Sequence, residues 1–222
     1  MTIGIAAKGP NAGAGVFAGL RAVENIGRGA IKGFVSLAVL TEDQKLLRAD
    51  TQDGGTRGLF DGPPPPVVLQ APYAALISSG PNRPRPLSQF IAAEPGVGIV
   101  TGHRFPHVHT DEGDALNDLV LRAIRRGVPA QDAIDEVIAA HSSYDAGFIA
   151  LSSNGDMGLG NMPLVMRLSH HGATHAHCAE TGAEVAILHN AIQPNRAIAV
   201  VASEVTLDEI RRSVTEIQTI TV

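Results

Sequence analysis

The order of apolar and polar positions predicts short strands grouped with strands and helices grouped with helices. Apolar runs bounded by turn residues predict a buried strand at Thr2–Ala7 and two more in the segments AALISSG and GVGIVTG. Two hairpins are expected. One turns through the polar residues Thr41–Gln44, and the other lies in AGFIALSSNGDMGLGN, where Asn-Gly separates two strands. Hairpins indicate antiparallel sheets.

Helical spacing of apolar residues recurs in three places. It predicts a helix over Val16–Ile26, and two adjacent helices further along, the first capped by Asp114 and the second opened by Pro129. The proline-rich segment FDGPPPPVVLQAP is expected to be a surface connection rather than a strand or helix, because proline fixes φ and removes a donor.

The last quarter of the chain contains two further apolar runs, AEVAILHNAI and RAIAVVASEV, both rich in β-branched residues, as strands often are. A helix is expected to start after them, because Thr206 and Glu209 have the spacing of a capping box. No internal repeat is visible. The pattern predicts one domain over residues 1–222 with an α+β fold, a layered sandwich of antiparallel β-sheets covered by α-helices.

Composition narrows the class of protein. Hydrophobic residues make up 44% of the 222 positions and charged residues 18%, as in ordinary globular proteins. The net charge of −5 lacks the basic excess of a nucleic-acid-binding protein. No apolar run approaches the ~20 residues of a membrane span, no signal peptide is visible, and Cys178 is the single cysteine. We expect a cytoplasmic protein that acts on a small molecule and binds neither nucleic acid nor membrane, with a homo-oligomer left open.

Three ordered segments carry a family resemblance: VTGHRF, IRRGVPAQDAIDEVI and AGFIALSSNGDMGLGN. Over roughly residues 98–161 they resemble the plant-type asparaginases and isoaspartyl peptidases of the N-terminal-nucleophile (Ntn) hydrolase superfamily. The resemblance implies an Ntn-type layered fold and hydrolysis of a small amide or peptide-like bond. It also implies a pocket that includes Thr101, Gly102, His103 and Asn161. The Gly54–Gly55 turn in TQDGGT ends a predicted strand, where pockets form, and is a further substrate-binding candidate.

The nucleophile departs from the asparaginase pattern. Those enzymes have a catalytic threonine after a glycine, whereas Phe34 follows Gly33 in this chain, so self-cleavage is not expected there. The start MTIGIAA offers Thr2 instead, if Met1 is removed. The freed α-amino group, with an ordinary pKa of about 7.7–8.0, could act as the base for the Thr2 hydroxyl. Thr2 is therefore the candidate catalytic residue of an Ntn-type amidohydrolase.

The histidines suggest a different chemistry. His107 and His109 form an HVH pair, and His175 and His177 form an HAH pair beside Cys178. Each pair could present two imidazoles to one zinc ion, which makes a metal-dependent hydrolase the alternative. Histidines are also found in loops that bind no metal. Apart from zinc in this alternative, no cofactor is expected. A catalytically inactive member of the fold that binds a small ligand is the third hypothesis.

Overall fold

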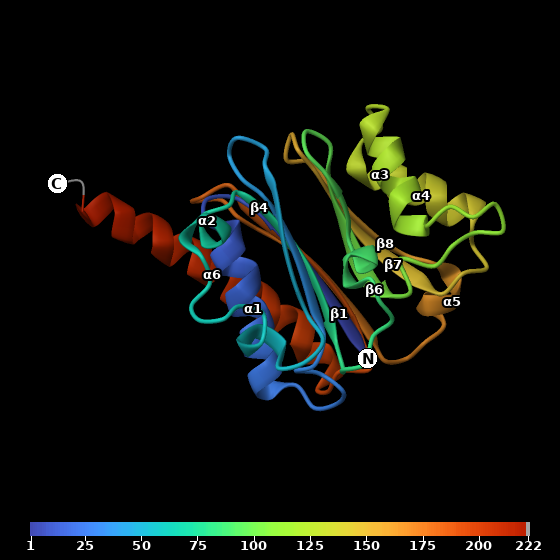
Figure 1. Cartoon of the computed structure of the whole chain (residues 1–222), viewed down its shortest axis with the longest axis horizontal. Coiled ribbons are helices and arrows are strands. Elements are labelled where there is room, and N and C mark those ends of the chain that lie inside the picture. Colours follow the sequence, from blue (N-terminus) through green and yellow to red (C-terminus); the bar gives the residue numbers. More distant parts are fainter. Residues whose placement is uncertain (221–222) are drawn as a thin grey trace.

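Two antiparallel sheets face each other at the centre of the protein (Figure 1). The computed structural model describes residues 1–220, and the side chains of all of these except 196 and 214–220. The large sheet has six strands in the order β3-β2-β4-β1-β10-β9, and the small sheet has four in the order β5-β6-β7-β8. The large-sheet strands are β1 (Thr2–Lys8), β2 (Val35–Leu40), β3 (Leu46–Thr51), β4 (Tyr73–Ser79), β9 (His171–Cys178) and β10 (Ala183–Asn190). The small-sheet strands are β5 (Ala92–Glu94), β6 (Gly98–Arg104), β7 (Ala146–Ser152) and β8 (Met157–Asn161).

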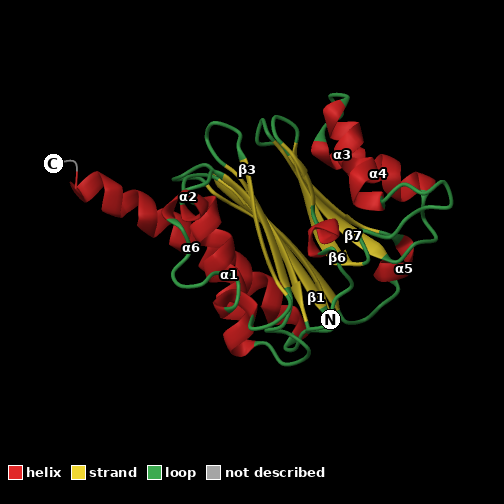
Figure 2. Ribbon diagram, in the orientation of Figure 1, coloured by secondary structure: helices red, strands yellow, loops and turns green. Residues whose placement is uncertain are grey.

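Helices cover the outer face of each sheet, which gives the order helix, sheet, sheet, helix (Figure 2). The outer face of the large sheet carries α1 (Ala12–Ile26) and α6 (Asn195–Ile220), and that of the small sheet carries α3 (Leu116–Arg125) and α4 (Ala130–Ala140). The shorter helices are α2 (Pro66–Leu69), α5 (Pro163–Met166) and the 3₁₀ turns η1 (Gly55–Arg57) and η2 (Leu87–Phe90). The predicted α+β sandwich of antiparallel sheets covered by helices is confirmed. Within the described chain, no helix is both long and apolar enough to cross a membrane.

Strand alternation divides the interior into three apolar cores. In β1, Ile3 and Ile5 point toward α1 and α6, whereas Ala6 points toward the small sheet. A second core lies between the sheets, and a third between the small sheet and its two helices. β1 occupies a central position in the large sheet, with β4 on one side and β10 on the other.

The two sheets approach most closely where two glycines meet. A Cβ atom added to Gly4 of β1 would overlap the carbonyl group of Gly102 in β6. At the residue before Gly102, the buried Thr101 hydroxyl donates a hydrogen bond to the Leu76 carbonyl oxygen of β4 at 3.1 Å. This backbone-to-backbone approach and the hydrogen bond beside it fix how the sheets lie relative to each other.

The helical C-terminal segment corrects the sequence analysis. RAIAVVASEV lies inside α6, which begins at Asn195, so the helix start predicted at Thr206 is wrong. The Thr206 hydroxyl donates to the Ala202 carbonyl within the helix at 2.7 Å. Gly19 of α1 leaves room for that threonine, because a Cβ there would overlap its hydroxyl. Packing of α6 on α1 and the large sheet therefore outweighs the β-propensity of these residues.

Two local predictions also need correction. The proline-rich segment forms a surface turn but includes the one-turn helix α2, with Pro66 in its first turn, where the missing N–H is tolerated. Asp114 does not cap α3, whose cap position is Ala115. The Asp114 carboxylate instead forms an ion pair with Arg122 at 2.6 Å.

We predict that Gly4→Ala lowers the free energy of unfolding by about 1–3 kcal/mol, because the new methyl group forces the sheets apart. Urea unfolding measures this change. Gly160→Ala is the matched control, since its Cβ would meet side-chain methyl groups of Ile134 and Ile138 and no backbone atom. Equal losses in the two variants would contradict a special close approach at Gly4.

Candidate active site between the two sheets

A row of polar residues lies at the end of the large sheet where β1 begins. The strand register places Thr2 opposite Ser79 of β4 on one side and opposite Asn190 of β10 on the other. Thr2 shares its face of β1 with Gly4 and Ala6, so its side chain points toward the small sheet. Ser79 and Asn190 are buried, which is unusual for polar residues unless they are bonded or functional.

Thr2 opens onto a small cavity of about 50 Å³. Its walls combine two arginines with aromatic rings, and Phe90 stacks between Phe34 (4.7 Å between centroids) and His107 (4.2 Å). The other lining residues are Ser79, Arg83, Pro84, Arg104 and Phe105. The cavity therefore places the two hydroxyl-bearing residues Thr2 and Ser79 beside two arginines and several aromatic rings.

The two arginines are held in different ways. Arg83 donates from Nε to the Ser79 hydroxyl at 2.7 Å and to the Gly80 carbonyl at 3.3 Å. Arg104 uses Nε (2.5 Å) and a terminal nitrogen to grip both carboxylate oxygens of Asp145, so its charge is already paired. Arg83 has no acidic partner among the described residues and keeps its terminal nitrogens for a ligand.

The amino group at the chain start is affected by the same environment. Burial lowers the pKa of the Met1 α-amino group from its ordinary value of 8.0, and the positive charges of Arg83 and Arg104 lower the pKa further. If Met1 were removed, the amino group of Thr2 would lie one residue away among the same charges. The same causes would favour the neutral form of that amino group, which can accept a proton.

Buried His103 and half-buried Asn161 form a pair on the facing surface of the small sheet. The His103 Nε2 and Asn161 Oδ1 atoms are 2.7 Å apart, on either side of β7. Gly147 lies between them in the register, and a Cβ there would overlap both side chains. Burial lowers the pKa of His103 to about 4, an effect that the Asn161 hydrogen bond opposes. His103 is therefore neutral at pH 7, and its Nδ1 atom has no hydrogen-bond partner among the described residues.

The other pocket candidates lie outside the cavity. Thr101 and Gly102 are fully packed between the sheets next to Gly4, and neither lines the cavity at Thr2. Gly54 and Gly55 follow β3, where the Gly55 amide donates to the Gly33 carbonyl at 2.9 Å and Glu24 of α1 accepts from Thr56. This turn connects the end of the large sheet to α1 on its outer face. Thr101, Gly102 and Gly55 are thus buried in packing contacts, whereas Gly54 is exposed but lies outside the cavity at Thr2.

The two histidine pairs belong to different elements. His107 stacks on Phe90 and His109 lies in the same loop after β6, whereas His175 and His177 are exposed on the edge strand β9. His175 lies 3.4 Å from the Glu184 carboxylate. In the described part of the chain, no three His, Cys, Asp or Glu side chains gather into a group that could hold a metal ion. The zinc alternative therefore gains no support from the geometry.

Sequence reasoning missed four residues at this site. Ser79 and Asn190 each end an apolar run, and Arg83 and Arg104 lie within a few residues of a strand end. Polar residues at the ends of buried strands are a usable signal, but the sequence does not show which strand ends are neighbours. The register between β1, β4 and β10 supplies that information.

Comparison with known proteins identifies a family without an assigned activity. Residues 2–219 match the family described as "Domain of unknown function (DUF6963)". No curated protein matches the sequence.

We predict that the free energy of unfolding falls as the pH is lowered from about 6.5 to about 4. The pKa of buried His103 is about 4 in the folded chain and near 6.5 when unfolded, so the unfolded chain takes up the proton first. Between pH 7.5 and pH 5, His103 alone should account for about 2 kcal/mol of the loss.

Denaturant unfolding at the two pH values checks this prediction. His103→Gln should flatten the pH dependence, whereas His175→Gln, which alters an exposed histidine, should leave it unchanged. A His103→Gln variant with an unaltered pH dependence would refute the assignment.

Proposed function

We propose that the chain, which belongs to the DUF6963 family, is an Ntn-type amidohydrolase that cleaves a small amide or peptide-like bond with Thr2 as nucleophile. The observation that carries the proposal is the position of Thr2. It is the first residue of a central strand, beside a cavity whose two arginines lower the pKa of the neighbouring amino group. The layered sandwich agrees with the resemblance to the asparaginases, and we propose kinship with that superfamily on the same grounds.

The chemistry needs only the terminal residue and a way to hold the substrate. After Met1 is removed, the neutral amino group of Thr2 accepts the proton of its own hydroxyl, and Oγ1 attacks the carbonyl carbon of the amide. The C–N bond then breaks, and the leaving amine takes the proton from the Thr2 ammonium group. Water hydrolyses the resulting ester to release a carboxylic acid and restore the hydroxyl. The Thr2 amine is protonated only transiently, and Thr2 is regenerated at the end of the cycle.

The tetrahedral intermediate carries a negative oxygen that needs a donor. Asn190 lies directly opposite Thr2 on the same face, and its buried Oδ1 atom has no hydrogen-bond partner among the described residues. We propose the NH₂ group of the same side chain as the donor to the oxyanion. Arg83, anchored through Nε on Ser79, can bind an anionic group of the substrate at the same time. His103 and Asn161 would shape the facing wall.

One contact favours a second candidate, the inactive ligand-binding protein. The Met1 sulfur accepts a hydrogen bond from the Ala30 amide at 2.9 Å and lies where a Cβ of Gly29 would be. A retained Met1 would leave Thr2 without a free amine, and the cavity could then only bind. We also propose a cytoplasmic location, which suits the one free cysteine.

We predict that the active protein lacks Met1 and that Thr2→Ala lowers amide hydrolysis on the order of 10³-fold or more. Thr2→Ser should keep measurable activity because it retains a hydroxyl. Thr51→Ala is the matched control, since that hydroxyl donates to the Asp53 carbonyl at the end of a remote strand.

Intact-protein mass spectrometry and release of ammonia or aniline from simple amides and anilides measure these outcomes. A retained Met1 in active protein, or full activity in Thr2→Ala, would remove Thr2 as nucleophile. A retained Met1 with ligand binding but no turnover would support the second candidate.

We predict that kcat/KM rises with pH through the pKa of the Thr2 amine, because only the neutral amine accepts the proton. Arg83→Gln removes one of the charges that lower this pKa, so the rise should move to higher pH. Arg21→Gln on α1, outside the cavity, should leave the profile in place. A shift to lower pH in Arg83→Gln would contradict the assignment of the amine as base.

A further inference from the structure

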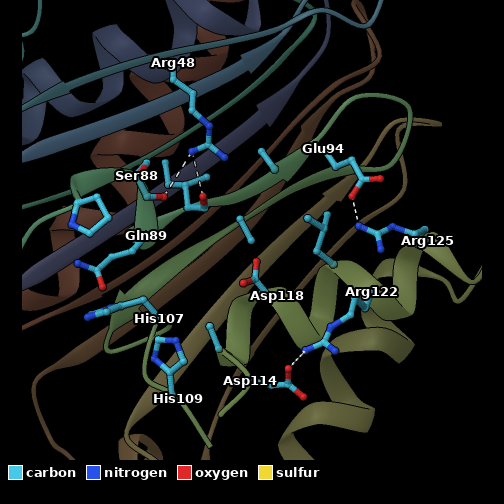
Figure 3. A pocket seen from close by; sticks show the side chains of 16 residues that line it. Arg48, Ser88, Gln89, Glu94, His107, His109, Asp114, Asp118, Arg122 and Arg125 are labelled. Atoms are coloured by element: carbon cyan, nitrogen blue, oxygen red, sulfur yellow. Dashed lines mark hydrogen bonds and ion pairs between the residues drawn. The ribbon is translucent and has the colours of Figure 1, made fainter.

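A large groove adjoins the Thr2 cavity. Its volume is about 740 Å³, and it lies between β3, the segment that joins η2 to β5, and α3 (Figure 3). His107 lines both the groove and the cavity, so one imidazole separates the two spaces. The volume far exceeds what the cavity alone could accept. A ligand in the groove would therefore end close to Thr2.

Most charged side chains in the groove are already paired. Arg122 is bonded to Asp114 and Arg125 to Glu94, as the dashed lines in Figure 3 show. These pairs line one side of the groove and leave little charge for a ligand.

Two opposite charges remain available. Arg48 of β3 donates from one terminal nitrogen to the Ile91 carbonyl at 3.0 Å, which anchors it while its other nitrogens have no partner among the described residues. The Asp118 carboxylate of α3 has no hydrogen bond or ion pair within the described chain, and Figure 3 shows it across the groove from Arg48. Burial lowers the pKa of Arg48, and the charges of Asp50 and Asp118 oppose that shift. Arg48 and Asp118 both line the groove, so a ligand that fills the groove can contact both charges.

The groove also follows a free strand edge. β5 is the outermost strand of the small sheet, and Ala92, Ala93 and Glu94 all line the groove. The Ile91 carbonyl points outward to Arg48, and alternate residues of a strand direct their N–H and C=O groups to the same side. The N–H and C=O of Ala93 therefore point into the groove, where the small sheet gives them no partner.

We propose that this groove binds a short peptide with free ends in extended form, paired with the backbone of Ala93. The peptide carboxylate would bind Arg48 and its ammonium group Asp118. A free strand edge recognises the peptide backbone, and the two charges select unblocked ends. This assignment deepens the proposed function, on which it rests, because it names short unblocked peptides as the substrate class that reaches Thr2 past His107.

Binding of three ligands to the full-length Thr2→Ala protein tests the proposal without turnover. The ligands are triglycine, N-acetyl-triglycine, which lacks the ammonium group, and triglycinamide, which lacks the carboxylate. Isothermal titration should show that triglycine binds at least tenfold more tightly than either blocked form. In NMR titrations, the Ala93 amide signal should shift with triglycine.

Three variants assign the contacts. Arg48→Gln should make triglycine and triglycinamide bind equally, and Asp118→Asn should make triglycine and N-acetyl-triglycine bind equally. Ala93→Pro, which removes only an outward N–H at a sheet edge, should weaken all three ligands by about fivefold. The matched control is Arg126→Gln, which alters an arginine outside the groove that pairs with Glu136, and it should keep the wild-type preferences.

The outcomes separate this inference from the proposed function. Equal binding of the three ligands, no binding, or an unshifted Ala93 signal overturns the inference, even if a variant fails to fold. Charge-selective binding by a wild-type protein that hydrolyses no amide refutes the proposed function and leaves the groove assignment standing. Hydrolysis without charge-selective binding refutes the groove assignment and leaves the proposed function standing.

Discussion

The contact between Gly4 and Gly102 is the constraint on which the rest of the structure depends. Packed sheets normally lie about 10 Å apart because side chains fill the space between them. Here neither residue has a side chain, and the two backbones touch. The Thr101 hydroxyl adds a direct bond to the neighbouring strand. Thr2, two residues from Gly4 on the same face, is thereby held at a fixed height above β6.

This close approach explains why polar groups can lie between the sheets at all. Ser79, Asn190 and His103 are buried there, and an unpaired polar group in such a place costs roughly 1–3 kcal/mol. Part of the cost is relieved locally, since Arg83 bonds Ser79 and Asn161 bonds His103. The His103 Nδ1 and Asn190 Oδ1 atoms have no partners among the described residues, and Asn190 lies opposite Thr2 in the register. Proteins retain such unsatisfied groups where a ligand or a reaction uses them.

The sequence was informative where periodicity or turn chemistry acts locally. The Asn-Gly hairpin and the polar turn at Thr41–Gln44 appear in the structure, as does the helix predicted over Val16–Ile26, although it begins earlier, at Ala12. The sequence was misleading where packing between distant segments determines the structure. RAIAVVASEV is rich in β-branched residues yet helical, because α6 packs along the glycines of α1. The site divides in the same way. Thr2 and His103 could be named from motifs, whereas Ser79 and Asn190 become visible only with the strand register.

The cavity and the groove suit different tasks because the elements that form them differ in rigidity. Thr2 is paired with neighbours on both sides, so two strand ladders hold its backbone in place. The groove is lined by the short edge strand β5, which has few backbone bonds, by loop residues and by one side of α3. Rigid placement suits the bond-breaking step, and a free edge suits the recognition of a variable chain. His107, resting on Phe90 between the two spaces, is the single side chain through which the identity of the ligand could affect access to Thr2.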